Sequence, residues 1–185
     1  MWLPAVDGPY TSCSAWTRNV LEWLTADPPD VVIATTSGLY NAVHNGAEVS
    51  RDESRPLLAR GLSEAWNQLD AAGSRVVMLL DTPRANFDLP ECIAENDASL
   101  TACAYPRTGG VARSAAAIQL AAAEDADVDV IDLTDYICPG PRCAPVIGGV
   151  MVMRDSHHLT ATYALTLAPV LGMELAQVVP VPRQD

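Results

Sequence analysis

The chain has 185 residues, which is the usual size of one domain with its own hydrophobic core. Its formal net charge is −12, and its eleven basic residues are all arginine. This balance argues against nucleic acids and anionic membrane surfaces as partners, because proteins bind both through basic patches, and solubility is the simplest explanation of the acidity. The hydrophobic fraction of 49% is typical of a globular protein.

Helical and strand-like patterns alternate along the chain. In chain order the patterns predict a helix over 14–26, a buried strand over 30–35, an amphipathic helix over 55–72, a strand over 75–80, a helix over 111–124, a strand over 127–133 and a final helix over 159–171. The spacing of Trp16, Trp23 and Trp66 places all three in the core. The alternation predicts a mostly parallel α/β sheet covered on both faces.

The five cysteines predict a protein that is cross-linked by disulfides. Cys92 and Cys103 form one natural pair, Cys138 and Cys143 enclose a second, turn-rich loop, and Cys13 has no partner in the chain. Zinc is the rival interpretation, but neither spacing matches the usual Cys-x2-Cys ligand motifs. Disulfides indicate an oxidising, extracytoplasmic compartment.

The N-terminus carries no signal-peptide pattern, and no apolar run approaches the roughly 18 residues of a membrane span. The cysteines predict an exported protein, yet the sequence shows no signal for export, and these two observations contradict each other. We therefore expect the natural protein to be longer at its N-terminus, with a further strand of the sheet in the part that precedes this chain.

Asp155 and His158 form the most informative pair of side chains. An Asp placed three residues before a His can orient the imidazole as the general base of a hydroxyl-activating triad. The alternative is structural, with Asp155 as a helix cap and His158 as an ordinary first-turn residue. Because adjacent residues on a helix diverge by about 100°, we expect His157 and His158 not to share a metal ion, and the sequence predicts no metal and no cofactor.

Several segments together resemble one family. The stretch from Arg154 to Tyr163, which contains Asp-Ser-His-His-Leu-Thr, is similar to the last block of SGNH-type ester hydrolase domains. More narrowly, it resembles the extracytoplasmic domain at the C-terminus of bacterial acyltransferase-3 membrane proteins. Segments in similar order include Tyr10 to Trp16, Asp81-Thr82-Pro83 and Cys103 to Arg107, so the likeness covers essentially the whole chain.

The resemblance implies a three-layer α/β/α, flavodoxin-like fold and the removal or transfer of small acyl groups on cell-envelope carbohydrate. His158 matches the base and Asp155 its orienting carboxylate, while Gly38 or Asn41 matches the place of the oxyanion hole. The implied partner is an acylated carbohydrate or another small ester. The implied location is the extracytoplasmic face of the bacterial membrane, with membrane contact only through a linked acyltransferase-3 domain.

One departure from the family pattern matters for activity. The family's nucleophile is a Ser in a Gly-Asp-Ser motif, and this motif occurs nowhere in the sequence. We therefore expect residues 1–185 to be a single SGNH-like domain shortened at its N-terminus, and inactive or nearly so. The alternative from another class is a non-catalytic module that keeps the fold and binds carbohydrate or docks a partner.

Overall fold

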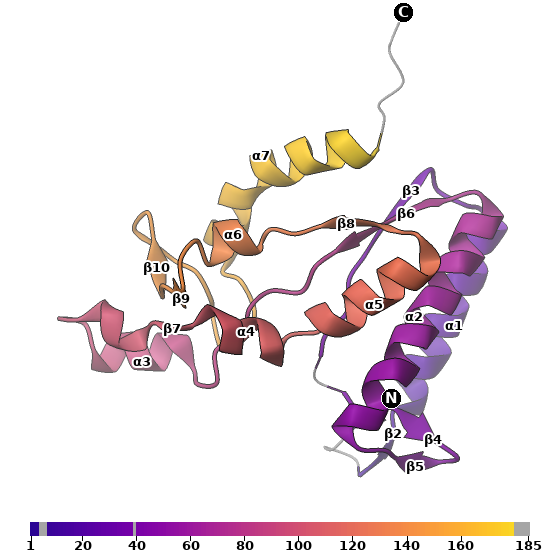
Figure 1. Ribbon diagram of the computed structural model, residues 1–185, viewed down its shortest axis with the longest axis horizontal. Coiled ribbons are helices and arrows are strands. Elements are labelled where there is room, and N and C mark those ends of the chain that lie inside the picture. The colour runs from indigo at the N-terminus through magenta and orange to yellow at the C-terminus, as the bar shows by residue number, and fades with distance from the viewer. Residues whose placement is uncertain (4–6, 39, 180–185) are drawn as a thin grey trace, which may run out of the picture. The chain divides into compact units, whose positions relative to one another are not determined.

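The computed structural model describes residues 1–3, 7–38 and 40–179, in which two compact units can be recognised. The first unit contains Met1–Leu79 and Ala117–Val130, and the second contains Leu80–Ala116 and the chain from Ile131 onward (Figure 1). Helices and strands are mixed throughout, which confirms the predicted α/β class. No helix among the described residues is long and apolar enough to cross a membrane.

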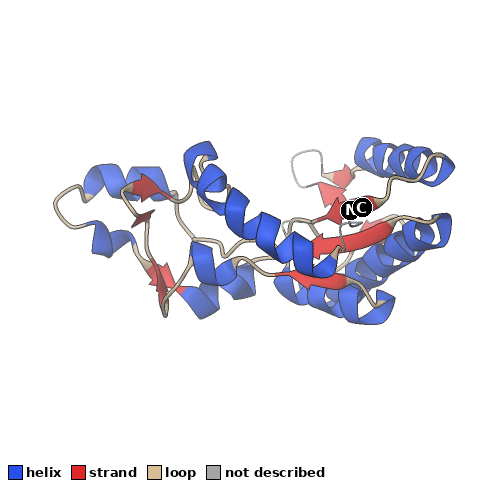
Figure 2. Cartoon of the chain, turned by 90° about the horizontal axis from the view of Figure 1, so that it is seen from above, coloured by secondary structure: helices blue, strands red, loops and turns tan. Residues whose placement is uncertain are grey.

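A three-stranded sheet forms the centre of the first unit. Its strands are β3 (Val31–Ala34), β6 (Arg75–Leu79) and β8 (Asp129–Ile131), in the order β3-β6-β8 (Figure 2). The pair β3 and β6 is parallel, as predicted, and Val77 at its centre is fully buried. All three predicted strands are present. The burial expected for the strand over 30–35 is wrong, because β3 contains no buried residue and Ile33 is 47% exposed, whereas the centre of β6 is buried.

The helices of the first unit are α1 (Thr11–Ala26), α2 (Arg51–Ala72) and α5 (Ala116–Ala126). Helix α2 begins at a capping box, in which Ser50 and Glu53 exchange hydrogen bonds, and ends at Gly73, whose φ of 109° suits glycine. The end of the helix agrees with the prediction over 55–72, whereas its start at Arg51 lies four residues earlier than predicted, because Ser50 caps it.

The prediction that all three tryptophans lie in the core is wrong for two of them. Trp66 is 4% exposed, but Trp16 and Trp23 on α1 are 65% and 70% exposed. Helix α1 packs chiefly along α2 and contains no buried residue. Helical spacing identifies an apolar face but does not supply the element that would cover it.

Two pairs of short antiparallel strands lie within the first 48 residues. Strands β1 (Trp2–Leu3) and β2 (Gly8–Pro9) pair antiparallel, as do β4 (Val43–His44) and β5 (Ala47–Glu48). The β4–β5 turn contains Asn45 and Gly46, both with positive φ. Asn-Gly is a strong signal for a two-residue hairpin, so this element could have been found in the sequence.

The second unit contains several short elements, three buried cysteines and one long helix, α7. Its elements are α3 (Leu89–Glu95), the 3-10 helix η2 (Leu100–Cys103), β7 (Tyr105–Pro106), α4 (Arg107–Arg113), α6 (Thr134–Ile137), β9 (Arg142–Cys143), β10 (Val146–Ile147), β11 (Val150–Met151) and α7 (Ala161–Val178). Strand β7 pairs with β9, and β10 with β11 around Gly148 and Gly149, as the glycines predict.

Both predicted disulfides are present, Cys92–Cys103 and Cys138–Cys143, and Cys13 is free. The single helix predicted over 111–124 is instead divided into α4 and α5. The break occurs because the backbone N–H of Ala115 donates to the carboxylate of Asp81 (2.8 Å) and that of Ala116 donates to the Ser114 hydroxyl (3.1 Å).

Candidate functional site

The Asp155 to His158 segment is a tight turn between β11 and α7. The backbone N–H of Arg154 donates to the carbonyl of His158 (2.8 Å) and closes the turn. Helix α7 begins at Ala161, where the Thr160 hydroxyl accepts from the Tyr163 N–H. The final helix therefore starts later than predicted, because Thr160 rather than Asp155 provides the cap.

Asp155 organises the turn instead. Its Oδ1 accepts hydrogen bonds from the backbone N–H groups of His157 and His158, both at 2.8 Å. The other carboxylate oxygen, Oδ2, faces the His158 ring and lies 2.6 Å from Nδ1. One carboxylate thus holds both the backbone of the turn and the imidazole of His158. This double role explains why Asp155 lies three positions before His158.

Electrostatics keep Asp155 ionised. Burial raises the pKa of its carboxyl, but hydrogen bonds from the N–H groups of His158 and His157 and from the His158 ring outweigh it and hold the pKa well below its ordinary range. An ionised carboxylate at Nδ1 favours the tautomer with the proton on that nitrogen. The other nitrogen, Nε2, is then the one that can accept a proton from a hydroxyl. The His158 side chain is 52% exposed, so a substrate can reach it.

His157 lies against His158, with ring centroids 3.9 Å apart. Its Nδ1 is 3.0 Å from the Ser156 hydroxyl and 3.5 Å from Oδ1 of Asp155. Burial lowers the pKa of the His157 ring, and the charges of Arg84 and His158 lower it further, against the influence of Asp155 and Asp81. The prediction that neighbouring histidines diverge assumed helical geometry, which this turn does not have.

The turn is anchored on the segment that follows β6. The Ala85 N–H donates to the carbonyl of Ser156 (2.9 Å), and the Thr82 hydroxyl donates to the carbonyl of His157 (3.1 Å). In the sequence, Asp81-Thr82-Pro83 is distinguished only by the family resemblance. Its contact with the histidine turn becomes visible only in the tertiary structure.

Gly38 and Asn41, the two residues expected at the oxyanion hole, belong to the first unit. Gly38 is buried, and the side-chain amide of Asn41 donates to Oε1 of Glu48 (2.8 Å). Asp155 and His158 belong to the second unit. The oxyanion role of Gly38 and Asn41 therefore stays a prediction.

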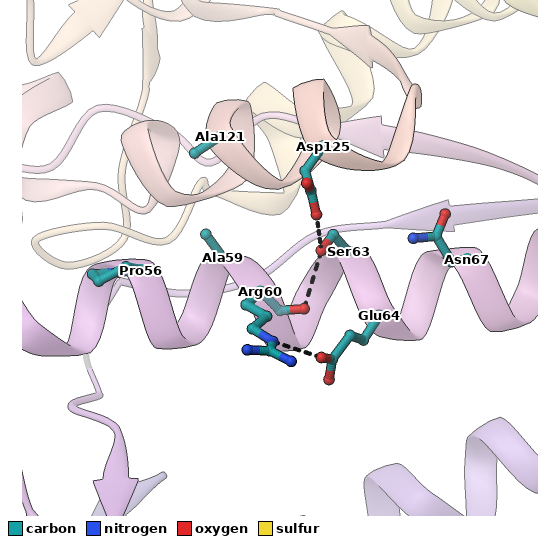
Figure 3. A pocket seen from close by; sticks show the side chains of 8 residues that line it. All are labelled: Pro56, Ala59, Arg60, Ser63, Glu64, Asn67, Ala121 and Asp125. Carbon is teal, nitrogen blue, oxygen red and sulfur yellow. Dashed lines mark hydrogen bonds and ion pairs between the residues drawn. The ribbon is translucent and has the colours of Figure 1, made fainter.

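A second candidate site is a pocket of about 470 Å³ between α2 and α5 (Figure 3). Within it the buried Ser63 hydroxyl donates to Oδ2 of Asp125 (2.6 Å), and the Arg60 guanidinium pairs with Glu64 (2.8 Å). The lining residues are Pro56, Ala59, Arg60, Ser63, Glu64, Asn67, Ala121 and Asp125. Polar groups of both signs beside small apolar side chains suit a small polar ligand, and no histidine lines this pocket to serve as a base.

Comparisons with known proteins identify a family and a similar fold for the chain. The family model described as the SGNH domain (fused to AT3 domains) matches residues 2–172. No curated protein matches the chain. A solved structure with a similar fold is the periplasmic domain of the lipopolysaccharide acetyltransferase of Salmonella ser. Paratyphi A, with 19% identity and a TM-score of 0.57. The match covers 85% of this chain and 61% of that domain.

Proposed function

The chain belongs to the SGNH domains that are fused to AT3 domains, and from this we propose that it is of the acyl-ester hydrolase or O-acyltransferase type and acts on acyl groups of cell-envelope carbohydrate. The observation that carries the proposal is the 2.6 Å contact between Oδ2 of Asp155 and Nδ1 of His158. The acetyltransferase named above supports an acetyl group as the acyl group. The two disulfides support an extracytoplasmic location.

The proposed roles follow from the chemistry of acyl transfer. A hydroxyl oxygen attacks the ester carbonyl while Nε2 of His158 takes the hydroxyl proton, and the tetrahedral intermediate expels the alcohol, which receives that proton. Asp155 stabilises the imidazolium that exists between these two proton transfers. We propose Gly38 and Asn41 as donors to the developing oxyanion.

The attacking hydroxyl is the part that this sequence does not provide in the family's form, because Gly-Asp-Ser is absent from it. Loss of a triad nucleophile lowers turnover by about a millionfold. We therefore propose that the 185-residue chain binds acyl esters but hydrolyses them little or not at all.

Two measurements test this proposal. With p-nitrophenyl acetate, the chain should hydrolyse no faster than its His158→Ala variant; hydrolysis that disappears in that variant would overturn the inactivity. With an O-acetylated disaccharide, the His158 ring signals in NMR spectra should shift, and they should shift less with the deacetylated sugar. Identical responses to the two sugars would contradict the acyl-ester proposal.

The alternative function, a non-catalytic carbohydrate-binding module, is favoured by the pocket between α2 and α5. In that case sugar binding should survive His158→Ala and weaken in Asp125→Ala, which removes the carboxylate paired with Ser63. The opposite pattern would place the ligand at the histidine turn.

A further inference from the structure

We propose that Asp155, His157 and His158 form a binding site for a divalent transition-metal ion of the Zn²⁺ type. The proposal goes beyond the acyl-ester function and does not depend on it. The three residues each offer one ligand atom, and these atoms all lie within 4.8 Å of one another.

The distances suit a single ion. Oδ2 of Asp155 lies 2.6 Å from Nδ1 of His158, and Oδ1 lies 3.5 Å from Nδ1 of His157. In a tetrahedral zinc site with bonds of about 2.0–2.1 Å, neighbouring ligand atoms are about 3.3 Å apart. The ion would therefore replace the hydrogen bond between Asp155 and His158, and small side-chain rotations would complete the set.

The turn itself brings the two rings together. Oδ1 of Asp155 accepts hydrogen bonds from the N–H groups of His157 and His158, so the backbone forms a bend at these residues and not a helix. The rings consequently lie 3.9 Å apart, centroid to centroid. The contacts from Thr82 and Ala85 to this turn hold its backbone before an ion arrives, which reduces the entropy lost on binding.

The donor set and its accessibility are also suitable. Two imidazoles and one carboxylate are ligands that zinc and other transition metals accept, and three protein ligands leave a position for water. The side chains of His157, Asp155 and His158 are 23%, 33% and 52% exposed, so an ion from solvent can reach them. The positive charge of Arg84 and the negative charge of Asp81 act on the His157 ring in opposite directions.

A bound ion would have a consequence for the proposed base. The metal would take the oxygen and the nitrogen that orient His158 in the acyl-transfer mechanism. Metal binding and the proposed base function of His158 would therefore be mutually exclusive at this turn.

The test is calorimetric titration of the whole chain with Zn²⁺, in a Cys13→Ser background that removes the free thiol. We expect one ion per chain, and His157→Ala and His158→Ala should each weaken binding at least about tenfold. The chain's third histidine, His44, is exposed in the β4–β5 hairpin, so His44→Ala is the matched control and should bind as the parent does.

Substitution of His157 separates this proposal from the acyl-ester one, because His157 has no role in the proposed acyl transfer. Co²⁺ absorption in the visible range should report nitrogen ligation in the parent and lose intensity in His157→Ala. Unchanged Zn²⁺ affinity in His157→Ala, or an equal loss in His44→Ala, would overturn the metal site. Circular dichroism of each variant distinguishes loss of a ligand from loss of the fold, and Asp155→Asn gives a second variant in which weaker binding is expected.

Discussion

The Thr82 hydroxyl donates a hydrogen bond of 3.1 Å to the backbone carbonyl of His157, which lies 75 positions further along the chain. Thr82 follows the end of β6, and His157 lies in the turn that carries the carboxylate–imidazole pair. This bond, together with the one from the Ala85 N–H to the Ser156 carbonyl, connects the turn to a distant segment of its own unit. The backbone of the turn that carries His158 is therefore held by residues far away in the sequence.

Thr82→Val should loosen this turn. The substitution keeps the shape of the side chain but leaves the His157 carbonyl without its donor, so we expect the free energy of unfolding to fall by about 1 kcal/mol. Thr82→Ser retains the hydroxyl and is the matched control. Urea denaturation of the three proteins measures the difference, and equal stabilities of the Val and Ser variants would contradict the anchoring role.

Gly110→Ala should destabilise the second unit. A Cβ at this buried position would lie 2.9 Å from Cε2 of Tyr105 and 3.1 Å from Cβ of Pro83, both in packed side chains. Overpacking of this kind costs about 1–3 kcal/mol. At Gly61, inside α2, an added Cβ would meet nothing within 4 Å, so Gly61→Ala should stabilise by up to about 1 kcal/mol. Thermal unfolding of both variants checks the opposite signs.

Removing either disulfide should cost stability. The two bridges close short loops, with sequence separations of 11 for Cys92–Cys103 and 5 for Cys138–Cys143, and the chain-entropy model assigns such loops about 2–3 kcal/mol. Paired Cys→Ala variants, compared with the parent by urea denaturation without reductant, measure the loss. Cys13→Ser removes an unpaired thiol and should change stability little; an equal loss in this control would contradict the prediction.

Alkaline pH should unfold the protein partly through Tyr105. Burial raises the pKa of its phenol to about 12, a shift that Arg113 only partly opposes, and the hydroxyl donates to the carbonyl of Pro83 (3.2 Å). The unfolded chain loses this proton near pH 10, before the folded protein does, so stability should fall as the pH rises from about 10 to about 12. Urea midpoints at about pH 9, 10 and 11 test this, and the fall should be smaller in Tyr105→Phe.

Local features of this protein could be predicted from neighbouring residues. The apolar run from Val76 to Met78 indicates a buried strand, the Ser50 and Glu53 pair begins α2, and Gly73 ends it. Gly148 and Gly149 predict the β10–β11 turn. The Asp155 and His158 pair could also be identified, because its hydrogen bonds join groups only three positions apart. Each of these signals depends on sterics or hydrogen bonds within one or two turns of chain.

Features that depend on distant partners could not be predicted in this way. Trp16 and Trp23 have the spacing of a buried face, but only the packed structure determines that no element within the described ranges covers them. The helix expected over 111–124 breaks because Asp81, 34 positions away, accepts the Ala115 N–H.

The amino-acid order alone therefore determined the three strands of the sheet, the end of α2, the cysteine pairs and the carboxylate–imidazole couple. Tertiary structure decided how His157 meets His158, which segment supports them and which tryptophans stay in solvent. The physical reason is the separation along the chain of the groups that interact. Short-range sterics act on every conformation of the chain, whereas a contact such as Thr82 with His157 exists only after folding has brought two remote segments together.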